Sequence, residues 1–208
     1  MDITTLSRAI AAVAFISMPL PASAEGNLVP VDVVKVISPD HHPYFNVLPA
    51  DLIGRIIDSL DAQMALVPIP RLKCGRPAFL KYCNGNVNED VLFSVTETAS
   101  GGDIDAFHRE GAPGYIYEVS ARVSGRAAPI SFVMFESLCV AMVSAMRTGG
   151  DNNEAYDLYI NAFTRAGTRS GSGDGVWVDR DNPSILVVEV RSVNETTVTC
   201  RMASQWSD

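Results

Sequence analysis

The chain has few of the residues and motifs on which familiar catalytic sites depend. Its 208 residues include three histidines and four cysteines. It contains no G-x-S-x-G sequence, and none of its histidines lies in a recognisable catalytic motif. A serine or cysteine nucleophile needs a base and an orienting group beside it. We therefore do not expect a hydrolase with a serine or cysteine nucleophile.

Positive charge is also scarce. The chain has 16 lysines and arginines against 24 aspartates and glutamates, which gives a formal net charge of −8. An acidic chain is repelled by phosphate backbones and by anionic membrane surfaces. We therefore expect no nucleic-acid partner, and the overall charge weakly favours cationic partners.

The apolar run nearest the N-terminus is short. Residues 9–16 are apolar, which is far below the roughly 20 residues that a membrane span needs. Two prolines and the small-residue triplet 22–24 follow it, so we expect residues 1–24 to be a signal peptide that is cleaved before Glu25. The alternative is a buried N-terminal helix of a cytosolic protein. We expect a periplasmic or secreted protein with no membrane span in its mature part.

Four cysteines, Cys74, Cys83, Cys139 and Cys200, all follow the predicted cleavage site. An even number of cysteines in an exported chain indicates disulfides. We expect Cys74–Cys83 to close a local loop and Cys139–Cys200 to tie a helix to the last strand. Zinc is the alternative, but no pair has the C-x-x-C spacing of structural zinc sites.

Hydrophobic periodicity predicts three helices and about five strands. The helices are expected over residues 48–64, 131–147 and 151–167, and the strands over 29–37, 91–98 and 115–123, with a terminal hairpin from 186–190 and 198–202. Residues 67–90, 99–114 and 168–175 lack periodicity and are expected to be loops.

This order of elements indicates the fold class. Strands and helices alternate too seldom for a doubly wound parallel sheet. We therefore expect residues 25–208 to form a single α+β domain, stabilised by disulfides. Its antiparallel or mixed sheet would have about five strands, covered mainly on one face by about three helices.

The expected helices differ in character. The helix over 131–147 is apolar on most of its circumference and should be central, with Ser131 as its cap. Glu136 is the acid on that helix whose apolar setting could raise its pKa, although pairing with an arginine at the helix edge is the more ordinary expectation. Asp151 followed by Glu154 predicts a capping-box-like start of the next helix.

Two weak candidate sites involve titratable residues. His41 and His42 lie in a turn, and His108 could join them in space with nearby carboxylates to hold zinc or copper. Glu97 and Glu118 lie on strands that could pair, so they could form a carboxylate pair. Solvent-exposed turn residues and ordinary ion pairs are the simpler interpretations of both, and we expect no cofactor.

One segment suits a binding role better. Arginine, lysine and aromatic side chains are concentrated in a disulfide-held loop, and one further aromatic lies in a polar loop downstream. The candidates are Arg71, Lys73, Arg76, Phe79, Tyr82 and Phe107. Arginine and tyrosine are typical contact residues of protein interfaces.

The sequence thus predicts an exported, disulfide-stabilised binding or accessory module whose partner is another exported or envelope protein. The alternative is a small periplasmic enzyme or metal-binding protein that uses His41, His42 and His108. A third hypothesis is a structural component of an envelope assembly, with the terminal hairpin as an exposed sheet edge for strand addition.

Overall fold

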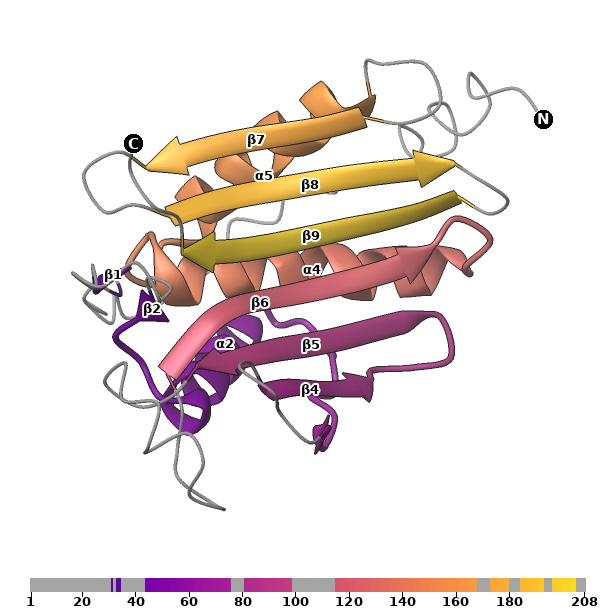
Figure 1. Cartoon of the computed structure of the whole chain (residues 1–208). Coiled ribbons are helices and arrows are strands. Elements are labelled where there is room, and N and C mark those ends of the chain that lie inside the picture. Colours follow the sequence, from indigo (N-terminus) through magenta and orange to yellow (C-terminus); the bar gives the residue numbers. More distant parts are fainter. Residues whose placement is uncertain are drawn as a thin grey trace.

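An antiparallel sheet with three helices packed on one of its faces makes up the fold of the computed structural model (Figure 1). The structure describes residues 31, 33–34, 44–75, 81–98, 115–167, 173–179, 184–192 and 196–204. The α+β class is confirmed. Helices are confined to one face of an antiparallel sheet, which is a stable way to bury the apolar sides of both.

Seven strands form the main path of the sheet, in the order β3-β4-β5-β6-β9-β8-β7. Two further short strands lie off this path, where β1 pairs with β2 and β2 pairs with β6. The strands are β1 (Val33–Val34), β2 (Tyr44–Phe45), β3 (Lys73–Cys74), β4 (Lys81–Asn86), β5 (Val91–Thr98), β6 (Tyr115–Ser124), β7 (Gly173–Asp179), β8 (Ser184–Ser192) and β9 (Thr196–Ser204). The expectation of about five strands was therefore too low.

The extra strands come from segments that we expected to be loops. β3 and β4 lie within residues 67–90, where prolines and glycines obscure the alternation. β7 begins at Gly173, inside the Ser/Gly-rich stretch that ends at Gly175. Glycine is unusual in a strand, and here it is required by the close approach of a helix, as described below.

The terminal hairpin of β8 and β9 is confirmed, but its place in the sheet differs from the third hypothesis. β9 pairs with β6 on one side and with β8 on the other, so it lies inside the sheet and not at its edge. Its backbone groups are already paired, and a partner cannot add a strand there. The prediction that the terminal hairpin forms an exposed sheet edge is therefore wrong.

Three helices cover the sheet, close to their expected positions: α2 (Pro49–Ala62), α4 (Pro129–Met146) and α5 (Asn152–Gly167). α2 begins at a proline in its first turn and buries a stripe of Leu52, Ile56 and Leu60. α4 contacts both other helices and the central strands, which explains why it is apolar nearly all round. By length and composition alone α4 could cross a membrane, but most of it is buried inside the described fold.

The start of α4 differs from the expected cap. The helix begins at Pro129 with Ala128 at its N-cap, so Ser131 lies inside the first turn. The Ser131 hydroxyl instead donates to the Asp90 carboxylate at 2.8 Å. α5 begins as expected, since the Asp151 carboxylate accepts hydrogen bonds from the backbone N–H groups of the residues two and three positions later.

Arg147 ties the end of α4 to β7. Its guanidinium forms an ion pair with Asp179 and lies 5.9 Å from the centre of the Trp177 ring. Both charged side chains are largely buried, at 11% and 13% exposed. A buried pair of this kind is costly to break, because removal of one partner leaves the other charge buried and unpaired.

Candidate functional site

The face of the sheet opposite the helices is the broadest candidate surface in the described part of the chain. Side chains alternate along each strand, so one set meets the helices and the other set points away from them. Facing away are Lys73, Tyr82, Asn84, Ser94, Glu118, Ser120, Arg122, Asp174, Val176, Val178, Glu189, Arg191, Thr199 and Arg201. We call this surface the helix-free face.

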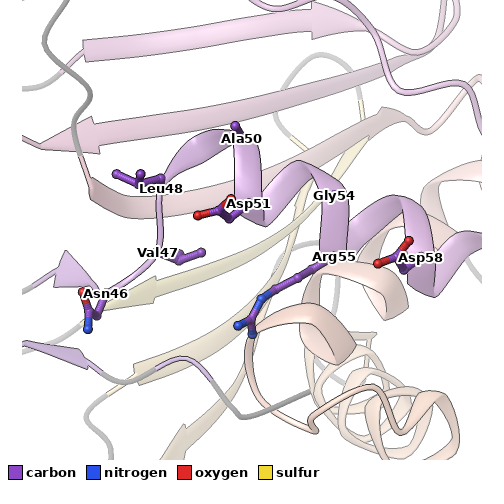
Figure 2. Close-up of a pocket in the computed structure, with 8 residues that line it drawn as sticks. All are labelled: Asn46, Val47, Leu48, Ala50, Asp51, Gly54, Arg55 and Asp58. Atoms are coloured by element: carbon purple, nitrogen blue, oxygen red, sulfur yellow. The ribbon is translucent and has the colours of Figure 1, made fainter. Parts of the chain in front are cut away.

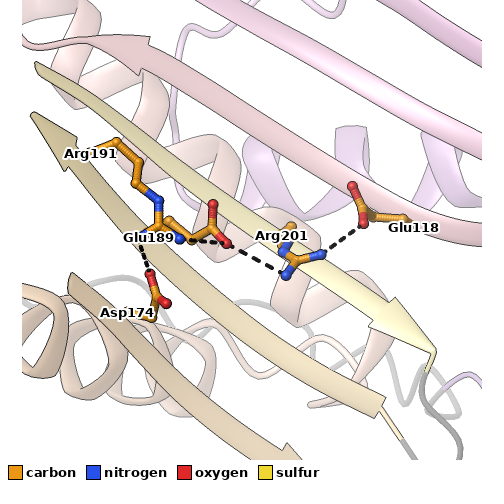
Figure 3. Close-up of polar contacts among 5 residues, drawn as sticks. All are labelled: Glu118, Asp174, Glu189, Arg191 and Arg201. Atoms are coloured by element: carbon orange, nitrogen blue, oxygen red, sulfur yellow. Dashed lines mark hydrogen bonds and ion pairs between the residues drawn. The ribbon is translucent and has the colours of Figure 1, made fainter. Parts of the chain in front are cut away.

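A chain of ion pairs crosses four strands of the helix-free face (Figure 3). Arg191 lies 3.0 Å from Asp174 and 3.6 Å from Glu189. Arg201 continues the chain, 3.6 Å from Glu189 and 3.3 Å from Glu118. Each pair is partly exposed, and such pairs contribute about 0–1 kcal/mol each to stability. This chain of ion pairs, which we call the ion-pair ladder, therefore fixes the positions of its charged groups more than it stabilises the fold.

Two further basic residues lie on this face outside the ladder. Lys73 on β3 and Arg122 on β6 are both exposed. The face thus carries four basic side chains against three acidic ones. Because the whole chain has a net charge of −8, the negative excess lies elsewhere, for example on α2 with Asp51, Asp58 and Asp61.

Tyrosines gather where β4, β5 and β6 meet on this face. Tyr82 is 61% exposed, and it lies opposite Thr96 in the β4–β5 ladder. The register between β5 and β6 shifts there, since Thr96 pairs with Glu118 and the next residue, Glu97, pairs with Ile116. Tyr117 is the extra residue of this β-bulge. Bulges re-aim side chains and recur beside functional sites.

The bulge places Tyr117 in a distinct electrostatic setting. Burial and the neighbouring Glu118 carboxylate raise the pKa of Tyr117 above its ordinary value, while Arg201 opposes them. Ionisation of Tyr82 would raise the Tyr117 pKa further, which places the two phenols within electrostatic reach of each other. At neutral pH Tyr117 is therefore a neutral phenol that can donate a hydrogen bond.

The same strand carries the predicted carboxylate pair, which does not form. Glu118 points to the helix-free face and binds Arg201, whereas Glu97 points to the opposite face. The bulge does not bring the two acids together. Glu97 instead forms an ion pair with Lys81 at 3.0 Å and is 5% exposed.

The cysteines are bonded in part as predicted. Cys74 and Cys83 form a disulfide between directly opposite residues of β3 and β4. Cys139 and Cys200 are free thiols, so the predicted second bond is not present in the structure. They do face each other across α4 and β9, and the neighbouring Cys200 is among the groups that raise the pKa of Cys139. Burial raises the pKa of the Cys139 thiol well above its ordinary value, and a thiol kept protonated is slow to oxidise.

A hollow lies along the exposed side of α2 and the segment that precedes it (Figure 2). Its volume is about 610 Å³, and its lining is polar, with Asp51, Arg55 and Asp58 on successive turns of the helix. Arg55 is held by a 3.4 Å hydrogen bond to the Ala145 carbonyl oxygen. The hollow is shallow and open, and its charged groups do not converge on one point.

The other predicted site residues divide into two groups. Arg71, Lys73 and Tyr82 are all exposed near the β3–β4 edge, which brings part of the predicted binding segment together. Outside the described residues lie Arg76, Phe79 and Phe107, and also His41, His42 and His108. The metal hypothesis therefore stays a prediction.

Of the two expectations for Glu136, only the raised pKa agrees with the structure. Burial raises its pKa above the ordinary value for a glutamate. Among the described contacts of this carboxyl there is no arginine, and its charge acts instead on Tyr156 and Tyr159 of α5. The expected pairing at the helix edge is not seen.

Sequence reasoning missed two features of this region. Nothing in the sequence marks Tyr117 as a bulge residue, because the alternation from 115 to 123 looks regular. The proximity of Glu97 to the disulfide was also missed, since it depends on the pairing of β4 with β5.

Comparisons with known proteins add no assignment. No protein-family model matches the chain, and no curated protein or solved structure matches it either.

Proposed function

We propose that this protein is an exported, non-catalytic binding module that uses the helix-free face of its sheet to hold an acidic segment of another exported or envelope protein. The observation that carries the proposal is the excess of basic side chains on this face of an otherwise acidic protein. Overall charge weakly favours a cationic partner, but binding depends on the local surface, and here Lys73 and Arg122 are added to side chains that already pair with one another.

The residues of the face support a protein partner. Tyr82 is exposed diagonally opposite Lys73, and Arg122 lies two strands away and four residues further along. Tyrosine and arginine are enriched among the residues that dominate binding energy. Val176 and Val178 add exposed apolar area at the β7 edge. A face with charged, aromatic and apolar contacts is typical of a protein interface.

Export is supported by two independent features. Residues 1–24 have the pattern of a signal peptide. The Cys74–Cys83 bond is compatible with an oxidising compartment. Intact-mass measurement on protein from the source cell tests this part. A mass that begins at Glu25 supports export, and a full-length mass in the cytosol contradicts it.

Binding can be tested with a defined acidic probe. Backbone amide NMR shifts would be followed while a polyglutamate peptide is added, with polylysine as the control. We expect polyglutamate to shift residues of β4, β6 and β9 and to lose affinity in high salt. Arg122→Glu should weaken the effect severalfold, and Arg165→Glu on α5 should not. Preference for polylysine, or shifts confined to the helices, would overturn the proposal.

A further inference from the structure

A buried acid lies directly beside the disulfide, on the side of the sheet away from the helix-free face. The Sγ atom of Cys83 is 3.4 Å from the Glu97 Oε1 atom. The Sγ atoms of Cys74 and Cys83 and one carboxylate oxygen of Glu97 all lie within 4.8 Å of one another. A disulfide needs no neighbouring acid for its own stability. A thiol that must lose its proton does benefit from a neighbouring carboxylate, which can accept that proton.

The two sulfurs differ in access. Cys74 is exposed on β3, a strand of two residues at the edge of the sheet. Cys83 is 1% exposed on β4. An external sulfur compound can therefore reach Cys74, while Cys83 is screened. This is the usual division between an attacked cysteine and a resolving cysteine.

Lys81 completes the arrangement. Its ammonium group forms a 3.0 Å ion pair with Glu97 Oε2, which leaves Oε1 directed at Cys83. Among the described residues, Lys81 and Glu97 are the charged groups next to Cys83. The ion pair keeps a nearly buried carboxylate in place and compensates its charge.

We propose that the Cys74–Cys83 pair is a thiol–disulfide exchange site, in which small-molecule or protein disulfides react at Cys74 and Glu97 accepts the proton of Cys83. This site is separate from the proposed binding face, and it does not depend on that function.

The reaction balances in two steps. The Cys74 thiolate attacks a disulfide R–S–S–R, so that a Cys74–S–S–R bond forms and one R–S⁻ leaves. The Cys83 thiol then gives its proton to the Glu97 carboxylate, and its sulfur attacks the Cys74 sulfur. The Cys74–Cys83 bond forms and the second R–S⁻ leaves. The two cysteines lose two electrons, which R–S–S–R gains, and a dithiol drives the same steps in reverse.

Oxidised glutathione tests the proposal on the folded, reduced protein. Acid quenching and peptide mass spectrometry would follow two species: the mixed disulfide with glutathione and the protein in which the Cys74–Cys83 bond has formed. We call the formation of that bond closure. We expect glutathione to appear on Cys74 and to be displaced by Cys83. Glu97→Gln should slow closure at neutral pH by about 100-fold, the lower range for loss of a general base. The closure rate of the Glu97→Gln variant should also rise steeply with pH, because hydroxide must then take the proton of the Cys83 thiol.

Glu136→Gln is the matched control, because it neutralises another partly buried acid that lies away from these cysteines, and it should close like the wild type. A second measurement needs no substitution: reduced glutathione acting on the folded, oxidised protein should give an adduct on Cys74. An adduct on Cys83, opening of the bond only in denaturant, or wild-type closure in Glu97→Gln at every pH would overturn the proposal.

Discussion

Gly175 in β7 lies against the backbone of Ala162 in α5, so closely that a Cβ atom at position 175 would overlap the Ala162 carbonyl group. This contact sets the distance between α5 and the edge of the sheet. It also explains why a glycine occurs in the middle of a strand, where it would otherwise weaken pairing.

Gly175→Ala should therefore be strongly destabilising. β7 and α5 must separate, and overpacking of this kind costs about 1–3 kcal/mol or more. Gly54→Ala is the matched control, since a Cβ there meets nothing within 4 Å. In a helix interior that change should stabilise by about 0.5–1 kcal/mol. Urea unfolding measures the change in the free energy of unfolding for both variants, and we expect opposite signs. Equal changes would contradict the close contact between Gly175 and Ala162.

Glu136→Gln should change the pH dependence of stability. Because burial raises the pKa of Glu136 in the folded state, its stabilising contribution is full below the pKa of the unfolded chain and is lost as pH rises through the folded pKa. The glutamine variant should therefore be more stable than the wild type at pH 7, with the gap closing below about pH 4.

Thermal unfolding across this pH range provides the measurement for Glu136. Glu154→Gln, on the exposed side of α5, is the control and should show no such trend. A glutamine variant that is less stable than the wild type at pH 7 would show that Glu136 has a favourable charged partner.

The Cys74–Cys83 bond should contribute modestly to stability. It closes a short loop, with a sequence separation of 9 residues, and the chain-entropy model assigns such a loop roughly 2–3 kcal/mol. The Cys74→Ser, Cys83→Ser double variant should lose about this much free energy of unfolding in urea while it keeps its far-UV circular dichroism. Loss of the folded state would mean that the bond does more than restrict the unfolded chain.

Cys139 and Cys200 should remain thiols in the native protein. Both are fully buried, so alkylation should label neither in the folded state. After denaturation without reduction, two cysteines should be labelled, and peptide mapping should place them at 139 and 200. Labelling of none would show that the second bond forms after all.

The sequence predicted much of the fold because the strongest patterns were local. The stripe of α2, the alternation of β6 and the cap of α5 by Asp151 each depend on residues close in the chain. β7 was missed because the glycine required by α5 makes the strand resemble a loop. The packing partner of Gly175 lies 13 positions earlier and cannot be inferred from local sequence.

The candidate site was less predictable. The sequence identified Lys73 and Tyr82 as contact residues, but the helix-free face also needs Arg122 and the ion-pair ladder. These residues come together through the insertion of β9 between β6 and β8, a long-range pairing. Glu97 and Glu118 are separated because Thr96, not Glu97, lies opposite Glu118, and this register of β5 against β6 cannot be read from the sequence.

Site-specific photo-cross-linking in the source cell tests the central claim most directly. A photoreactive residue would replace Tyr82 on the helix-free face or, as the control, Asp58 on α2. The account predicts a discrete adduct with one exported or envelope protein from position 82, none from position 58, and loss of the adduct when Arg122→Glu is added. Adducts that are equal from both positions, absent from both, or formed with another copy of this chain would contradict it.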